Sequence, residues 1–120
     1  MATYINSVSS TGTLTATQAA APGAVWNLTF LSVSFAGPSR GPNARLSIYD
    51  GAAGSGTLLF RVFLDQPTLS VGYTQNITLP QDQRGNVGIQ SSPGAAMNIV
   101  VEGFGANIAS LNARIVDGLP

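Results

Sequence analysis

The stretch WNLTFLSVSF, residues 26–35, carries the strongest structural signal in this chain. Large apolar residues occupy every second position up to Phe30 and then, after a slip of one residue, every second position from Leu31. Alternation of this kind is typical of a strand with one buried face. The slip would turn the second apolar set outward, unless a β-bulge near Phe30 and Leu31 absorbs the extra residue. The alternative is a strand that passes from one core to another surface. In either case we expect a central strand, with Trp26 and Phe30 in the core.

Shorter alternating segments surround this strand, separated by Gly and Pro turn signals. We expect strands around residues 12–17, 46–48, 58–64, 73–79, 87–89, 97–101 and 111–115. No stretch shows a convincing helical period of 3.6 residues. The pattern predicts an all-β fold of 7–8 strands, either a single antiparallel β-sandwich (jelly-roll or Ig-like) or a small barrel.

The chain has 120 residues, which is the length of one domain. Residues 1–24 are rich in Thr, Ser and Ala and end in Ala21-Pro22-Gly23, with only weak alternation. We therefore interpret residues 1–24 as an extended N-terminal arm with one short strand, and residues 25–120 as the β-sandwich domain.

Residues 51–56 consist only of Gly, Ala and Ser, and they raise the possibility of a phosphate-binding loop. Such a loop of the P-loop type needs a lysine after its last glycine and opens a helix. This chain has no lysine, and the segment leads into the strand-like residues 57–60. The glycines instead suit the turn of a hairpin, since positive φ is easily adopted by glycine.

The residue types that carry most protein catalysis are scarce. The chain contains neither histidine nor cysteine, which excludes Ser-His-Asp catalysis and thiolate or imidazole metal sites. Its five acids are dispersed, without a local metal-ligand spacing. We predict no catalytic, metal-binding or cofactor-binding residue, and a protein that is not an enzyme. Tyr49 and Tyr73 are the aromatic residues expected at the surface.

Charge is sparse as well. Only 8% of residues are charged, the net charge is zero and neither sign clusters. This excludes the basic stripe of a nucleic-acid-binding protein and a polybasic membrane contact. A free soluble domain usually has more surface charge, so we expect much of this surface to be buried in an assembly; a neutral polar domain is the alternative. Residues 1–10 lack the features of a secretory signal, and no apolar run could span a bilayer, so we expect synthesis in the cytoplasm.

Two motifs add a family resemblance. Residues 23–28 have the pattern Gly-x-x-Trp-x-Leu, and residues 46–51 the pattern Leu-x-Ile-Tyr-Asp-Gly. Together they resemble small virion structural proteins of tailed bacteriophages, over residues 23–64. The resemblance implies a structural protein of the virion, most simply a capsid decoration or cement protein that bridges capsid subunits. Its partner would be the major capsid protein or another virion protein. The alternative is a tail, neck or fibre-associated module that recognises host-surface glycan.

The terminal segments hold apolar residues without an obvious place in the core, and an extended segment can pair with the edge of a neighbouring sheet. We therefore expect a homo-oligomer, a trimer in the first instance, in which the terminal segments form the contacts between subunits. The alternative is that both ends of the chain are frayed. The expected subunit or capsid contacts are Tyr4, Ile5, Val8, Ile115, Val116 and Leu119.

Overall fold

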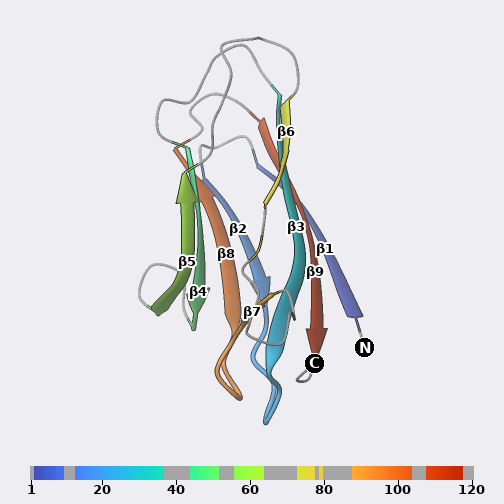
Figure 1. Ribbon diagram of the computed structural model, residues 1–120, viewed down its shortest axis with the longest axis vertical. Helices are drawn as coiled ribbons and strands as arrows, with labels where there is room; N and C mark the ends of the chain where they lie inside the picture. The colour runs from blue at the N-terminus through green and yellow to red at the C-terminus, as the bar shows by residue number, and fades with distance from the viewer. Residues whose placement is uncertain are drawn as a thin grey trace.

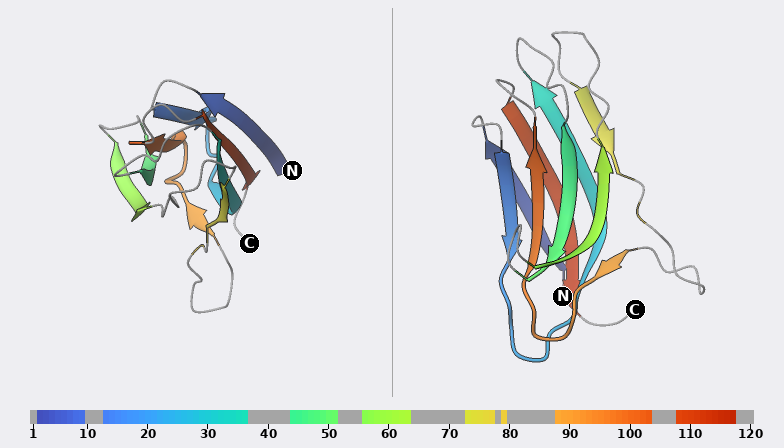
Figure 2. Two further views of the ribbon diagram at one scale, coloured as in Figure 1. Left: turned by 90° about the horizontal axis from the view of Figure 1, so that it is seen from above. Right: turned by 90° about the vertical axis from the view of Figure 1, so that its left-hand side faces the viewer.

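The computed structural model describes residues 2–9, 13–36, 44–51, 56–63, 73–77, 79, 88–103 and 108–117. These residues form two antiparallel sheets that face each other (Figure 1; Figure 2). Sheet A has the order β1 (Ala2–Ser9), β9 (Ile108–Asp117), β3 (Trp26–Ala36) and β6 (Tyr73–Asn76), and the short β7 (Ile89–Gln90) also pairs with β3. Sheet B has the order β2 (Thr13–Gln18), β8 (Met97–Glu102), β4 (Arg45–Asp50) and β5 (Thr57–Phe63). The expected all-β sandwich is confirmed, and the two separate sheets exclude a barrel.

The connectivity of the sheets is a series of nested antiparallel pairs. β4 pairs with β5, β3 with β6, β2 with β8 and β1 with β9, so the chain folds like one long hairpin rolled into two layers. Successive pairs alternate between sheet B and sheet A. This is the connectivity of a jelly roll, and it decides between the jelly-roll and Ig-like alternatives.

The phase slip in the central strand is absorbed as a β-bulge. The register of β3 against β9 shifts between Leu28 and Phe30, which leaves Thr29 as the additional residue. Leu28 and Leu31, on either side of the shift, are both fully buried, so both apolar sets face the core. The predicted bulge is confirmed, and its additional residue, Thr29, lies two positions before Leu31. The prediction that Phe30 lies in the core is wrong, because the bulge turns this side chain outward and leaves it 47% exposed.

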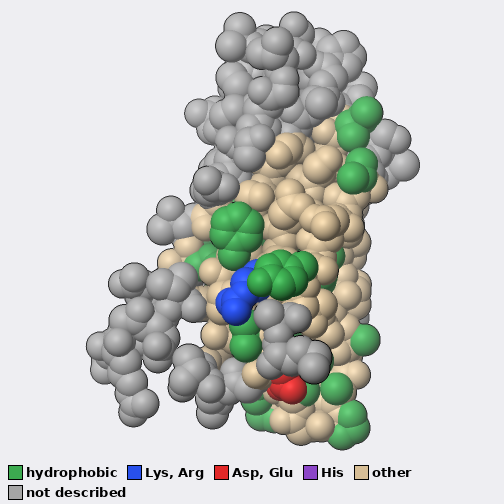
Figure 3. All heavy atoms as spheres, turned by 90° about the vertical axis from the view of Figure 1, so that its right-hand side faces the viewer, with side chains coloured by type: hydrophobic (Ala, Val, Ile, Leu, Met, Phe, Trp, Pro, Cys, Tyr) green, Lys and Arg blue, Asp and Glu red, His purple; other side chains and the backbone are tan. Residues whose placement is uncertain are grey.

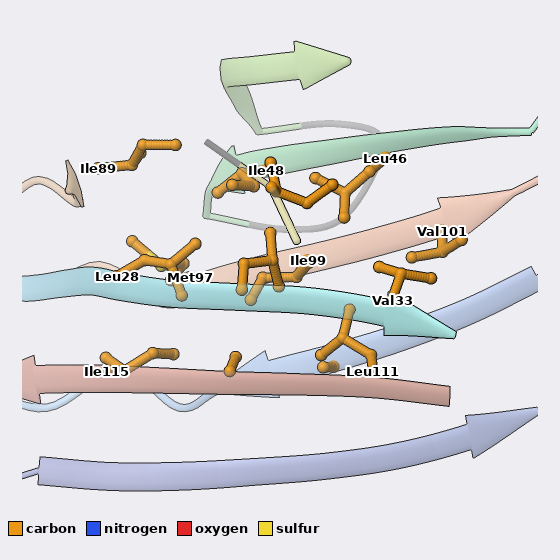
Figure 4. Packing of buried hydrophobic residues seen from close by; sticks show 14 of the residues in the cluster. Leu28, Val33, Leu46, Ile48, Ile89, Met97, Ile99, Val101, Leu111 and Ile115 are labelled. Carbon is orange, nitrogen blue, oxygen red and sulfur yellow. The ribbon is translucent and has the colours of Figure 1, made fainter. Parts of the chain in front are cut away.

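The core lies between the two sheets and is made of aliphatic side chains from both (Figure 4). Leu28 and Val33 of β3, Ile48 of β4 and Ile99 of β8 all belong to this layer of fully buried side chains between the sheets (Figure 4). In β9 the buried residues alternate with outward ones, as its sequence pattern predicts. Trp26 is also buried, as expected.

The glycine-rich segment joins two paired strands, as expected of a hairpin. β4 and β5 are antiparallel neighbours on either side of it. Gly51 has a φ of 96°, a backbone conformation that other residues rarely adopt. Residues 52–55 of the turn lie outside the described part of the chain.

Residues 1–24, expected as an arm with one strand, contribute two strands to the sandwich in their described part. β2 coincides with the strand expected around residues 12–17. β1 was not expected; all eight of its residues pair with β9 at the edge of sheet A. In the described residues, β1 and β2 therefore both belong to the sandwich, and no boundary between an arm and the sandwich lies at position 24. Leu64 and Val87, expected at strand ends, lie outside the described residues.

Candidate interaction surface

The outward side of sheet A carries exposed apolar side chains from three neighbouring strands, in two groups separated by the polar row of Asn6, Asn112 and Ser32. β1, β9 and β3 lie side by side there, and their register places outward residues in rows across the sheet. We call this surface the A face and define it by Tyr4, Asn6, Val8, Phe30, Ile108, Asn112, Arg114 and Val116.

Arg114 occupies the centre of one such row. It lies opposite Tyr4 on β1 and opposite Phe30 on β3. Directly opposed side chains on neighbouring strands have Cβ atoms about 4.5–5.5 Å apart, so the cation is flanked by two aromatic residues. In Figure 3, which looks at this side of the molecule, a cationic side chain is bordered by hydrophobic ones.

The bulge residue orients this cation. Arg114 Nη1 donates a hydrogen bond to Thr29 Oγ1 (2.9 Å), and the same hydroxyl donates to the Arg114 carbonyl oxygen (3.2 Å). Among the described residues no carboxylate lies within ion-pair distance of Arg114. Its charge is therefore available to an acidic or carbonyl group on a partner.

The apolar residues of the A face are unusually exposed. Tyr4 is 71% and Val8 68% exposed, and Phe30 and Ile108 are each nearly half exposed. Grouped apolar side chains at the surface are typical of an interaction site, whereas single ones are not informative. Apolar residues around one unpaired arginine suit docking to another protein, because aromatic residues and arginine provide much of the affinity of protein interfaces.

Three of the six predicted contact residues lie on the A face, namely Tyr4, Val8 and Val116. Ile5 points to the other side of β1 and packs against the core. Ile115 is fully buried between the sheets, so its side chain is not available to a partner in this fold. Leu119 lies outside the described residues.

The sequence pattern did not predict Phe30, Ile108 or Arg114 as contact residues. A signal for Arg114 was present, because the alternation of buried residues in 111–115 places position 114 on the outward side. The position of Phe30 depends on where the bulge falls, and the pattern locates that only to within a residue or two.

The charged groups on the outward side of sheet B bond to one another or to neighbouring polar side chains of the same sheet. Arg61 Nε donates to Ser47 Oγ (2.9 Å), and its Nη2 donates to the Tyr49 hydroxyl (3.2 Å). Arg45 forms an ion pair with Glu102 (2.8 Å). Tyr49, expected at the surface, is half-buried in this network, and the side chain of Tyr73 lies outside the described part. Among the described residues, β5 of this sheet exposes two large apolar side chains, Leu58 and Phe63, against four on the A face.

The described residues also bear on metal binding and on membrane insertion. They contain no group of three or more acidic, histidine or cysteine side chains that could hold a metal ion. They contain no helix long and apolar enough to cross a membrane.

Comparisons with known proteins are sparse. No family model matches the chain, and no curated protein is significantly similar to it in sequence. Among solved structures, it is similar to a chain in the structure of infectious bursal disease virus, Gx strain, with 13% sequence identity and a TM-score of 0.42. The match covers 93% of this chain and 29% of the viral chain, so the chain spans less than a third of that protein. At this level the likeness carries no inference about function.

Proposed function

We propose that this protein is a non-catalytic structural component of a virion, and that it docks on the major capsid protein or another virion protein through the A face. In a decoration or cement role, a rigid sandwich would bridge neighbouring subunits and add buried area across their seam. The observation that carries the proposal is the row Tyr4–Arg114–Phe30, in which a cation without a carboxylate partner among the described residues lies between exposed aromatic residues.

Two further features support this role. The two sequence motifs resemble those of small virion proteins of tailed bacteriophages, and the jelly-roll connectivity occurs in many viral coat domains. The connectivity is an argument by analogy, because one fold supports many functions. The low charge of the chain agrees with a surface that is covered in an assembly.

The proposal is tested first by the number of copies per particle. Quantitative mass spectrometry of purified virions would measure this chain against the major capsid protein. Hundreds of copies per particle are expected of a decoration protein. A handful would favour the tail, neck or fibre position instead, and absence from purified particles would contradict any virion role.

A matched pair of variants then tests the surface. Phe30→Ser removes an exposed aromatic residue from the A face, and Phe63→Ser removes one from β5 of the other sheet, where Phe63 is 69% exposed. We expect only Phe30→Ser to weaken attachment to particles that lack the protein. Equal attachment of both variants would exclude the A face as the docking surface.

The alternative, glycan recognition at the host surface, makes a different prediction. A glycan-binding module would retain affinity for isolated host polysaccharide in the absence of any particle. Binding of the purified chain to host-surface polysaccharide, together with a low copy number, would favour this alternative over the capsid role.

A further inference from the structure

β1 is an edge strand of sheet A: among the described strands, β9 pairs with one of its sides and none pairs with the other. β1 is the last strand of sheet A, and its eight residues, ATYINSVS, include no charged residue, no proline and no glycine. An unpaired edge of this length presents backbone donors and acceptors to any other strand. Natural proteins usually protect such edges with lysine, proline, bulges or short strands.

The edge of β5 in sheet B shows the protection that β1 lacks. β5 carries Arg61, and its pairing with β4 is irregular at Ile48 and Tyr49. On the other side of sheet A, β3 pairs with two short strands, β6 and β7, rather than with one long one. β2, the other edge of sheet B, is also uncharged and regularly paired, but with six residues it is shorter than the eight-residue β1.

The side chains of β1 are complementary to those of a second, antiparallel copy. If Asn6 lies opposite Asn6 of the second copy, Tyr4 lies opposite Val8 of that copy, and Val8 opposite its Tyr4. The two most exposed apolar residues of the A face would then cover each other, and two amides would meet at the centre. Aromatic and β-branched residues form favourable cross-strand pairs. Because the strand has no charge, a copy does not repel itself.

We propose that β1 pairs antiparallel with β1 of a second copy of this chain, about a two-fold axis at Asn6. Sheet A then continues across the axis in the order β9, β1, β1, β9, and Ile5 on the inner side gains a neighbour in Ser7 of the second copy. Self-pairing about a two-fold axis closes the assembly at two chains. The unit is therefore a dimer, in place of the trimer guessed from the sequence.

This inference does not rest on the virion role, because the purified chain in solution is sufficient to test it. Sedimentation equilibrium is expected to show a dimer for the unaltered chain. Asn6→Lys places two like charges opposite each other at the axis and should weaken dimerisation by up to about fivefold. Asn112→Lys is the matched control: Asn112 is the partner of Asn6 on β9, also exposed on the same face but one strand away from the edge. It should leave the dimer intact.

Disulfide trapping tests the register, and the chain is suited to it because it has no cysteine of its own. Opposed residues of antiparallel strands have Cα atoms about 4.5–5.5 Å apart, a separation that a disulfide can bridge. Asn6→Cys should therefore give a covalent dimer on mild oxidation. Asn112→Cys should not, because three strand spacings, about 14 Å, would separate the two cysteines.

Melting temperatures of the four variants at low protein concentration would show that each is folded. A monomer at the highest soluble concentration would overturn the proposal. A dimer that Asn6→Lys leaves unchanged, or that Asn6→Cys fails to trap, would also overturn it, because another surface or register would then form the contact.

Discussion

At the scale of single residues, Thr29 allows one strand to place two apolar sets in the same core. Deleting Thr29 would remove the bulge and turn one of the sets outward. Two buried side chains such as Leu31 and Val33 would then be exposed, a loss of about 3–6 kcal/mol. This is comparable with the total stability of a small domain, about 5–15 kcal/mol. We expect the deletion variant to be largely unfolded by circular dichroism.

Thr29→Ala is the control for that deletion. It retains the additional backbone residue and removes the hydroxyl that bonds to Arg114, together with the γ-methyl group of the side chain. The loss should be about 1 kcal/mol. If Thr29→Ala were as disruptive as the deletion, the hydroxyl rather than the inserted residue would be responsible for the geometry of the strand.

Trp26 and Phe30 lie on the same strand but differ in burial. Trp26→Ala should destabilise the fold by about 3–5 kcal/mol, because it leaves a cavity. Phe30→Ala should reduce stability by only about 1 kcal/mol, since nearly half of its side chain is already in solvent. Urea denaturation of both variants measures the difference. A Trp26→Ala protein that melted like the unaltered chain would contradict the core position of Trp26.

At the scale of elements, the approach of β7 to β3 depends on a glycine. Gly88 has a φ of 145°, and a Cβ at this position would clash with Asn27 Oδ1 and lie 2.7 Å from the Leu28 carbonyl oxygen. Gly88→Ala must therefore displace β7 or the start of β3. It should lower the free energy of unfolding by more than the roughly 1 kcal/mol expected from backbone strain alone.

Gly23→Ala is the matched control, because Gly23 also has a positive φ, 71°, but has open space where a Cβ would lie. Denaturation of both variants separates steric exclusion from backbone strain. Equal losses of stability would mean that β7 tolerates the added methyl group, and that its contact with β3 is looser than the structure indicates.

A strand can be predicted from the sequence when it buries enough apolar side chains to produce an alternating pattern. β9 alternates between buried and outward positions over most of its length, and this pattern is visible in the residues themselves, whereas β2 shows only the weak alternation of Leu14 and Ala16. β1 has no such pattern, because it is an edge strand that buries little and is held mainly by its pairing with β9. Tyr4 and Ile5 are neighbours of opposite orientation, and hydrophobicity alone cannot assign them to different faces.

At the scale of the whole molecule, the candidate surface could be predicted only in part. The unusual content of apolar residues near the termini pointed to Tyr4, Val8 and Val116 as contacts. The sequence could not show that Phe30 and Arg114 join them, because that depends on which strands are neighbours and on their register. Such long-range pairing arises from the rolled hairpin as a whole and has no local signature.

The distribution of charge over the whole molecule predicts a weak response to salt. Of the described charged side chains, Arg45 and Glu102 form one ion pair at the surface. Arg61 and Arg114 donate to neutral oxygens, and Asp50 accepts from the backbone amide and hydroxyl of Ser92. A single exposed ion pair contributes about 0–1 kcal/mol. Little of the stability therefore depends on interactions that ions can screen.

Melting temperature and dimer affinity should consequently change little between about 0.05 and 0.5 M NaCl, a range over which the screening length falls from roughly 14 to 4 Å. Sodium chloride is the suitable salt, because sulfate would strengthen apolar burial and obscure the comparison. The proposed β1 contact consists of backbone hydrogen bonds and uncharged side chains, so it should persist at high salt. Dissociation of the dimer as NaCl rises would show that charged residues hold it together, and would contradict pairing through the uncharged edge of β1.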